Sequence, residues 1–318
     1  MMLSIVVCAY NEEGSIGPLL ENLICQRVPP EVVEREIVVV ASGCTDATVE
    51  VVRRYVGGTV TVKLVEQEAR LGKASALNRA FAVCEGDCVV LVPADVCPAA
   101  GAMFNLLVPF RDRSVSAVSG QPVQDPRVLS DGFVGYLAGM TYRLWGRLMR
   151  RLGERGEAGH CSGELMAVRK GVVTAIPEGC AADDSYIAIV ARRKGVIAFA
   201  SGAVGHNLMP RNIVDYVNQR RRWLFGHFQT KKVTGEFPTV MDTLVFSRPS
   251  VVLRVLVEEV AECPERAVFL VAAVVVEALI YVLAVFDHVL RREYGVWPVI
   301  RSTKYAEVEV VLEDTNVS

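Results

Sequence analysis

The chain has 318 residues, a formal net charge of −2 and a sequence pI of about 6.2. This length allows one large or two ordinary domains, and the near-neutral charge argues against a nucleic-acid partner. The hydrophobic fraction of 52% is high for a soluble protein, and much of the excess lies in residues 267–286, where Glu277 is the only charged residue.

The first part of the chain alternates between strand and helix patterns. Apolar runs at residues 3–9, 36–41, 60–66 and 87–92 predict strands, and the segments 16–25, 45–55 and 74–83 predict the helices between them. This βαβ spacing predicts an α/β domain with a parallel, doubly wound sheet. The start carries no basic region or cleavage site, so we expect no signal peptide.

Polar side chains follow the ends of all four predicted strands. They are Tyr10, Asn11 and Glu12, then Asp46, Lys73 and Asp95. Each alone could be a turn former, a helix cap or a solvated charge, but open α/β sheets bind ligands at this edge. Asp95, placed between two prolines, could hold a divalent cation that in turn holds phosphates, or it could cap a helix at 99–108.

The sequence around these positions resembles glycosyltransferase family 2. The signatures are Ala-Tyr-Asn-Glu at 9–12, Ser-Gly-Cys-Thr-Asp-Ala-Thr at 42–48, Gly-Lys-Ala-Ser-Ala-Leu-Asn at 72–78 and Ala-Asp-Val-Cys-Pro at 94–98. The later segments 115–122, 162–169, 182–184 and 219–223 continue the match, the last as a Q-x-x-R-W motif. The resemblance covers residues 3–230 and implies a GT-A domain at 1–232 that transfers sugar from a nucleotide-sugar with inversion.

The resemblance also implies roles for individual residues. It assigns Asp184 as catalytic base beside Asp183, and Mn²⁺ or Mg²⁺ as cofactor on Asp95. Apart from the resemblance, His206 could be a second metal ligand, because imidazole suits Mn²⁺. The implied donor-binding residues are Ala9, Tyr10, Asn11, Glu12, Asp46, Lys73, Asn78, Ala94 and Asp95. The implied diphosphate and acceptor residues are Gln219, Arg222, Trp223, Ser162 and Gly163.

Physical chemistry supports these roles. A cation on Asp95, with Lys73 and Arg222, would neutralise a diphosphate leaving group. Asp184 would take the proton of an acceptor hydroxyl, and repulsion from Asp183 would raise its pKa. The alternatives are an acidic helix N-terminus for the two aspartates and a structural hydrogen-bonding role for His206.

Two positions depart from the family pattern. Pro93 stands where the metal motif usually has its first acid, and Ala41 stands where the second strand usually ends in an acid. Base and ribose binding would then rest more on Glu12 and Asp46. The departures also allow a non-catalytic protein that only binds a nucleotide-sugar.

Three segments bear on membrane attachment. Residues 267–286 fit a transmembrane span by length and apolarity, with a buried core helix as the alternative. Residues 237–263 are more polar and fit an interfacial helix or a packed span, and residues 131–152 fit an interfacial helix or a helix packed on the sheet. Basic residues on both sides of 233–292 favour two crossings with the catalytic domain facing the cytoplasm, and with Arg220 and Arg221 at the lipid headgroups. The tail 293–318 includes a short alternating stretch at 305–311.

Together these features predict a membrane-bound hexosyltransferase with a lipid-linked acceptor of the dolichyl or polyprenyl phosphate type. GDP-mannose is the preferred donor and a UDP-hexose the alternative. A polyprenyl-phosphate sugar synthase and a polysaccharide synthase remain open.

Overall fold

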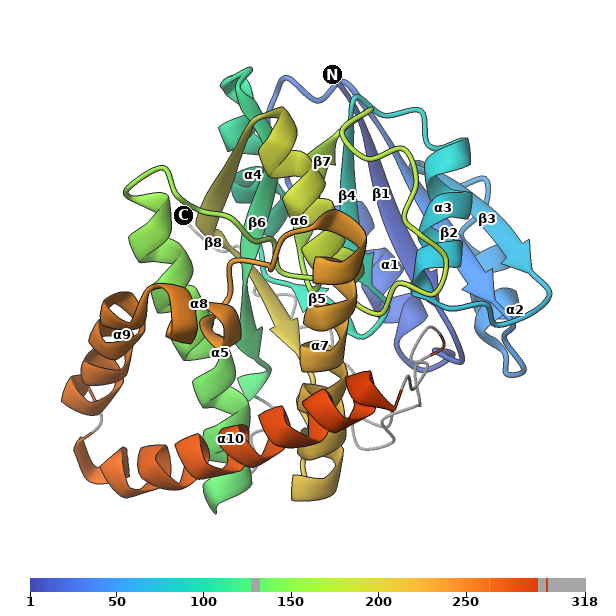
Figure 1. Cartoon of the computed structure of the whole chain (residues 1–318). Helices are drawn as coiled ribbons and strands as arrows, with labels where there is room; N and C mark the ends of the chain where they lie inside the picture. The colour runs from blue at the N-terminus through green and yellow to red at the C-terminus, as the bar shows by residue number, and fades with distance from the viewer. Residues whose placement is uncertain (127–131, 263, 291–295, 297–318) are drawn as a thin grey trace.

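The computed structural model describes residues 1–126, 132–262, 264–290 and 296. Its centre is a sheet with the strand order β3-β2-β1-β4-β7-β6-β8-β5 (Figure 1). The strands are β1 (Met2–Ala9), β2 (Glu34–Ser42), β3 (Thr61–Gln67), β4 (Cys88–Pro93), β5 (Val96–Pro98), β6 (Val115–Gln124), β7 (Met166–Arg169) and β8 (Val196–Asn207).

The sheet is mixed and mostly parallel. Strands β1 to β4 pair in parallel, as do β6 and β8. The short strand β7 runs antiparallel between β4 and β6, and β5 runs antiparallel to β8. The sequence patterns predicted the parallel half, whereas the antiparallel strands of four and three residues are too short to carry a pattern.

Helices cover both faces of the parallel half. Helices α1 (Ile16–Cys25), α2 (Thr48–Arg53) and α4 (Ala102–Leu107) pack on one face, and α3 (Lys73–Val83) and α6 (Asp183–Lys194) pack on the other. A 3-10 turn, η1 (Val108–Arg111), follows α4. Because both faces are covered, β1 is apolar along nearly its whole length, and β2 is apolar from Ile37 to Ala41.

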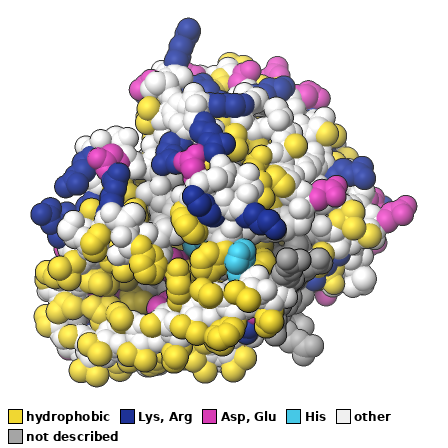
Figure 2. Space-filling view, viewed as in Figure 1, with side chains coloured by type: hydrophobic (Ala, Val, Ile, Leu, Met, Phe, Trp, Pro, Cys, Tyr) yellow, Lys and Arg dark blue, Asp and Glu magenta, His cyan; other side chains and the backbone are white. Residues whose placement is uncertain are grey.

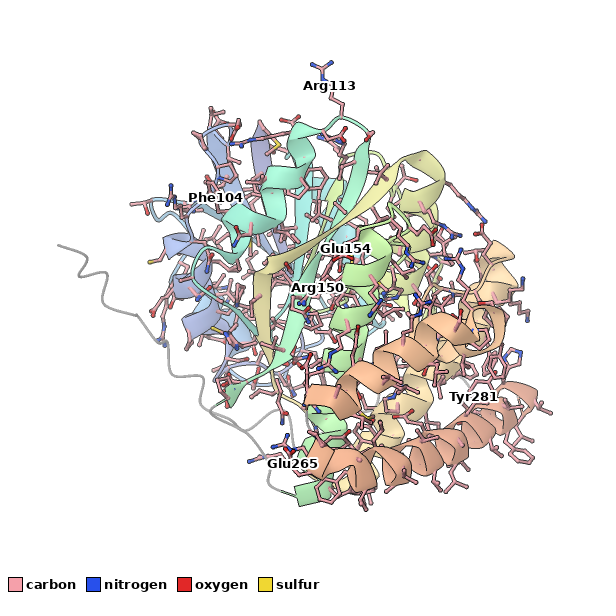
Figure 3. The ribbon with its side chains drawn as sticks, turned by 90° about the vertical axis from the view of Figure 1, so that its left-hand side faces the viewer. Phe104, Arg113, Arg150, Glu154, Glu265 and Tyr281 are labelled. Carbon is pink, nitrogen blue, oxygen red and sulfur yellow. The ribbon has the colours of Figure 1, made fainter. Side chains whose placement is uncertain are left out.

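A second hydrophobic core joins the remaining helices. These are α5 (Gly132–Gly153), α7 (Ile213–Thr234), α8 (Met241–Ser247), α9 (Pro249–Glu262) and α10 (Ala267–Val289), with the 3-10 turn η3 (Pro264–Arg266) before the last. Seen from the side, α9 and α10 lie at the end of the molecule opposite α4, with Glu265 and Tyr281 far from Phe104 (Figure 3).

Helix α5 lies largely inside the protein. Eleven of its residues are buried, including Leu137, Leu148 and Met149, and it packs on β6 and on α9. Two of its arginines are held by ion pairs, because Arg143 and Arg147 both bind Glu259 of α9. Of the two interpretations of residues 131–152, the structure shows the helix packed on the sheet.

The predicted second crossing at 237–263 is divided into two short helices. Helix α9 has 14 residues, about 21 Å, and so falls short of the hydrocarbon core of roughly 30 Å. Its carboxylates Glu258, Glu259 and Glu262 face arginines of α5. The hairpin of two crossings is therefore wrong, because this segment clamps α5. The tail 297–318, with its stretch at 305–311, lies outside the described residues.

Candidate active site

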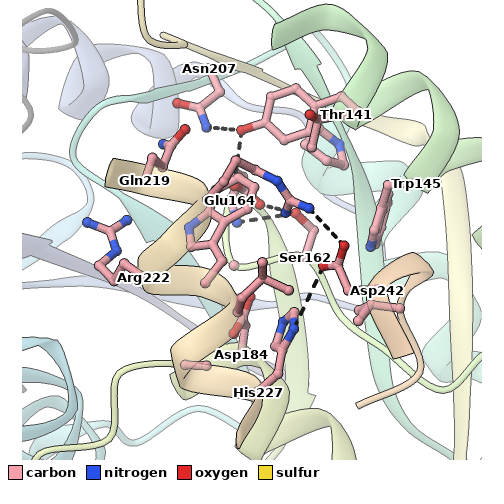
Figure 4. Close-up of a pocket in the computed structure, with 18 of the residues that line it drawn as sticks. Thr141, Trp145, Ser162, Glu164, Asp184, Asn207, Gln219, Arg222, His227 and Asp242 are labelled. Atoms are coloured by element: carbon pink, nitrogen blue, oxygen red, sulfur yellow. Dashed lines mark hydrogen bonds and ion pairs between the residues drawn. The ribbon is translucent and has the colours of Figure 1, made fainter. Parts of the chain in front are cut away.

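A cavity of about 690 Å³ opens at the carboxyl ends of β1 and β4 and continues between α5, α7, α8 and α10. Figure 4 shows polar side chains that line one end of it, among them Asp184, Glu164 and Arg222, and its other end is apolar. Thirteen of the residues implied by the family resemblance line it. They are Ala9, Tyr10, Glu12, Lys73, Ala94, Asp95, Ser162, Gly163, Asp183, Asp184, Gln219, Arg222 and Trp223.

Asp183 and Asp184 are the first two residues of α6. Asp183 is 2% exposed, and its Oδ2 lies 2.9 Å from Nζ of Lys73, at the start of α3. Burial raises the pKa of Asp184 to about 6, and the like charge of Asp183 adds to this effect. The two aspartates thus stand at a helix N-terminus, and the raised pKa of Asp184 is compatible with a catalytic base, which stays a prediction.

Gly163 lies against the carboxyl group of Asp184, where a larger residue would crowd it. A Cβ atom added to Gly163 would lie 3.1 Å from Oδ2 of Asp184. The next residue, Glu164, accepts hydrogen bonds from Ser162 and, at 3.1 Å, from the Tyr142 hydroxyl. Burial raises the pKa of Glu164 as well, and Asp184 contributes. The loop 162–164 therefore places a second buried carboxyl group, that of Glu164, near Asp184.

Helix α7 supplies the basic side chain of the cavity that the Q-x-x-R-W motif predicted. Arg222 is 5% exposed and lies in the field of Asp95, Asp183 and Asp184. Burial lowers its pKa to about 10, which leaves it protonated at neutral pH. Gln219 lies one turn earlier and is also buried, and its Oε1 has no hydrogen-bond partner among the described residues.

The donor end is built by the loops after β1, β3 and β4. Glu12 is 8% exposed and accepts a hydrogen bond from Ser15. The guanidinium carbon of Arg70 lies 4.0 Å from the centre of the Tyr10 ring, which braces that ring. Asp95 follows β4 on the cavity wall, as its position in the sequence predicted.

Three implied donor residues do not line the cavity. Asn11 bonds Thr45 in both directions, and Asp46 accepts from Thr48 and from the backbone N–H of Glu13. Both therefore tie the turn after β1 to the turn after β2. Asn78 exchanges two hydrogen bonds with the backbone of Ile176, each 2.8 Å. The structure gives all three a structural role, because loop hydrogen bonds consume their side chains.

The residues present fit a divalent cation held together with substrate phosphates. Within the described chain, no group of three or more His, Cys, Asp or Glu side chains forms a complete ligand set. Asp95 offers hard carboxylate oxygens. His206 does not line the cavity, but it pairs with Cys97 in β5, which begins directly after Asp95, and its buried Nδ1 lacks a hydrogen-bond partner.

Several lining residues were missed in the sequence. His160 and His227 are buried, and burial lowers their pKa to about 4 and about 3, so both imidazoles are neutral. Asp242 of α8 lies 3.8 Å from His227. Isolated histidines and a helix of seven residues carry no sequence signal, because tertiary contacts bring together His160 of the loop before β7, His227 of α7 and Asp242 of α8.

Arg220 and Arg221 do not reach outward to headgroups. Arg220 is 7% exposed and forms ion pairs with Asp242 at 2.8 Å and with Glu277 at 3.0 Å. Arg221 pairs with Asp287, which is fully buried. The predicted lipid contact of these two arginines is wrong, because carboxylates of α8 and α10 neutralise them inside the protein.

Comparison with known proteins bears on the family and the fold. A family model described as "Glycosyltransferase like family 2" matches residues 2–226. A mannosyltransferase from Pyrobaculum calidifontis, solved with GDP-Man and Mn²⁺, superposes with a TM-score of 0.62 at 24% identity, over 92% of this chain and 88% of that one. Glucosyl-3-phosphoglycerate synthase from Mycobacterium tuberculosis, solved with Mg²⁺ and UDP, gives 0.50 at 20% identity, over 72% and 79%.

Curated relatives match over shorter stretches. Dodecaprenyl-phosphate galacturonate synthase of Rhizobium johnstonii is 32% identical over 30% of this chain, and glycosyltransferase AglD of Haloferax volcanii is 29% identical over 40%. The aligned parts span only 28% and 20% of those proteins. The match over residues 2–226, on an α/β GT-A domain, shows that the chain belongs to glycosyltransferase family 2.

Proposed function

We propose that the protein is an inverting, metal-dependent hexosyltransferase that acts on a lipid-linked acceptor at the cytoplasmic face of a membrane. We propose mannose from GDP-mannose as the transferred sugar. The observation that carries the proposal is the shape of the cavity. One continuous space joins the carboxylates around Asp184 to an apolar passage lined by helices α5 and α8 to α10.

The polar end supports sugar transfer. In our scheme, ionised Asp184 takes the proton of an acceptor hydroxyl while the hydroxyl oxygen bonds to the anomeric carbon. The bond from that carbon to the diphosphate breaks, and the leaving nucleotide keeps its electron pair. Arg222 faces this region with a protonated guanidinium, and Lys73 holds Asp183 beside the base.

A bound Mn²⁺ or Mg²⁺ would supply Lewis-acid stabilisation of the leaving diphosphate. Asp95 would hold it, with His206 as the second protein ligand. The charge of the cavity supports a cation there, because seven acidic and four basic side chains line it. The Pyrobaculum and Mycobacterium structures hold Mn²⁺ with GDP-Man and Mg²⁺ with UDP, respectively.

The apolar passage supports a lipid-linked acceptor. Its walls include Leu144 and Trp145 of α5, Phe246 of α8, Leu256 of α9 and Val274 of α10. An isoprenoid chain could lie there with its headgroup at Asp184. Relatives named for polyprenyl and dolichyl phosphate substrates, such as dolichyl-phosphate beta-glucosyltransferase of Trichomonas vaginalis, match 29% to 30% of this chain.

A sugar hydroxyl suits this site better than a phosphate as nucleophile. A phosphate is already ionised and would meet Asp184, Glu164 and Asp242 as like charges. A polyprenyl-phosphate sugar synthase is the second candidate, supported by the names of those relatives. A purely nucleotide-sugar-binding protein is the candidate of another class, motivated by Pro93 and Ala41.

The test begins with thermal shifts of the full chain against GDP, UDP and their sugars, with and without Mn²⁺ or Mg²⁺. A ligand that binds only the folded state raises the melting temperature. We expect a metal-dependent shift with GDP-mannose, which Asp95→Asn removes.

Transfer to lipid-linked sugars and to bare polyprenyl phosphate is then compared for wild type and Asp184→Asn. We expect the variant to bind donor and lose transfer to the hydroxyl acceptor. Transfer that persists only to the phosphate would favour the synthase. Nucleotide binding with no transfer to either acceptor would favour the binding protein.

A further inference from the structure

Helix α10 has one buried stripe and one uncovered face. Its buried side chains, spaced three, four or seven residues apart, are Leu270, Ala273, Ile280, Ala284 and Asp287. The opposite face is apolar and open to solvent, with Val268 76%, Val271 68% and Leu279 60% exposed. The helix is long and apolar enough to cross a membrane, yet only 22% of its apolar window is buried. It is therefore no core helix.

The carboxylates of α10 all point away from the uncovered face. Glu277 accepts hydrogen bonds from Tyr216 and Arg220 of α7. Asp287 is fully buried against Arg221. The uncovered face therefore presents no carboxylate along the 23 residues of the helix, a length of about 35 Å.

The ion pairs at Glu277 determine how the helix can meet a membrane. Glu277 is the eleventh of the 23 residues of α10, close to its middle. In a crossing helix this position would lie near the bilayer centre, about 15 Å from either surface. Arg220, which is paired with Glu277, would then also lie near the bilayer centre. So would Arg222, on the same turn of α7, and the cavity that Arg222 lines. Charged groups at that depth are strongly unfavourable.

We propose that α10 lies in the plane of a lipid bilayer, with its uncovered face in the acyl-chain boundary, and does not cross the membrane. Figure 2 shows hydrophobic side chains gathered over α9 and α10, with a hollow between them. Leu253 and Val257 of α9 extend the surface, being 62% and 58% exposed. An apolar surface of this length without carboxylates fits lipid, and the exposed Arg266 at its start can reach the headgroups.

The same orientation places the cavity entrance in the lipid. Phe246 of α8 and Val274 of α10 line both the cavity and the exposed surface, at 69% and 51% exposure. A lipid-borne acceptor would enter sideways from the bilayer. This last step rests on the proposed function, whereas the orientation of α10 does not.

Depth-dependent fluorescence quenching tests the orientation. Val268→Trp, Leu279→Trp and Phe286→Trp place reporters at the two ends and the middle of the uncovered face. The purified full chain is bound to phosphatidylcholine–phosphatidylglycerol vesicles brominated either near the glycerol end or near the methyl end of the acyl chains. We expect the three added signals to be quenched alike, and more strongly by the shallow bromines.

A crossing helix gives a different result: Leu279→Trp is quenched most by the deep bromines, and the two ends by the shallow ones. That profile would overturn the proposal. So would absence of quenching at all three sites, which together with a concentration-dependent dimer in sedimentation would identify a second copy as the cover.

Charge variants provide a matched control. Val271→Asp and Val282→Asp lie on the uncovered face outside the cavity lining, and we expect each to reduce vesicle partitioning at least tenfold. Val33→Asp, at a position that is 77% exposed in the sheet domain, should leave partitioning unchanged. The thermal shift with nucleotide and metal, which depends on the catalytic end alone, should persist in all three variants. Equal partitioning of all three would contradict the proposal.

Discussion

The ammonium group of Lys73 and the carboxylate of Asp183 form an ion pair of 2.9 Å that joins the start of α3 to the start of α6. Burial alone would lower the pKa of Lys73, but Asp183 raises it, so the lysine stays charged. Asp184, the next residue, has a pKa raised to about 6, which is close to neutral pH. The chemistry of the site therefore depends on the balance of three charges.

The pH profile of transfer should report that balance. We expect kcat/KM to rise with pH through about 6, as Asp184 loses its proton, and then to level off. Asp183→Asn removes the like charge and should move the rising limb to lower pH. Lys73→Met removes the opposing charge and should move it to higher pH. A limb that neither variant moves would exclude Asp184 as the titrating group.

Asp184→Asn should stabilise the fold while it abolishes transfer. The folded pKa of about 6 exceeds the ordinary value of 3.8, so stability is lost as pH rises through this interval. The asparagine cannot ionise, so the variant should be more stable above pH 6, by about 1–3 kcal/mol, and equal to wild type below pH 4. Melting curves at pH 4 and pH 8 measure this difference. A lower melting temperature at pH 8 would contradict the burial of the charge.

Arg222 should act on the leaving group through its charge and its planar fork. Arg222→Gln should reduce kcat by about 10²–10³-fold, and Arg222→Lys should recover part of that loss. Steady-state kinetics with the donor and acceptor identified by the thermal-shift and transfer assays measures both. Arg192→Gln, at an exposed pair with Glu236, is the control and should leave kcat unchanged. Full activity in Arg222→Gln would exclude this role.

Two neighbouring glutamates of α9 should differ in their effect on stability. Glu259 is 2% exposed and pairs with Arg143 and Arg147, so Glu259→Gln breaks a buried network and should destabilise by about 3–5 kcal/mol. Glu258 is 36% exposed and pairs with Arg151 alone, so Glu258→Gln should change stability by less than about 1 kcal/mol. Urea unfolding of both variants gives the comparison, and equal losses would show that α9 is not held by the buried pair.

The sequence carried the parallel half of the fold and most of the polar end of the site. Apolar runs and the residues that follow them are local signals, so they predicted the positions of Lys73 and Asp95, whereas Asp184 was predicted from the family resemblance alone. The motif residues Asn11, Asp46 and Asn78 look like ligands in the sequence, yet loop hydrogen bonds occupy them.

The helices α7 to α10 were harder to predict from the sequence for a physical reason. Hydropathy sums a helix as a whole and does not record which side a charge faces. In the sequence, Glu277 was the one charged residue inside a predicted transmembrane segment, and Arg220 and Arg221 were predicted to contact lipid headgroups. The structure pairs these residues across 57 and 66 positions of sequence, a separation that no local pattern spans.

The three consecutive arginines of α7 have a mechanical consequence. Neighbouring positions on a helix differ by about 100° in direction and 1.5 Å in height. Arg220 and Arg221 form ion pairs with Glu277 and Asp287 of α10, whereas Arg222 lines the cavity. One turn of α7 therefore both binds α10 and supplies a cationic side chain to the cavity. If α10 lies in the bilayer surface as proposed, the reaction centre is held at a constant distance from the bilayer. An enzyme of the proposed function would then select acceptors by length, using glycolipids with a short sugar chain and not those whose sugar chain extends beyond that distance.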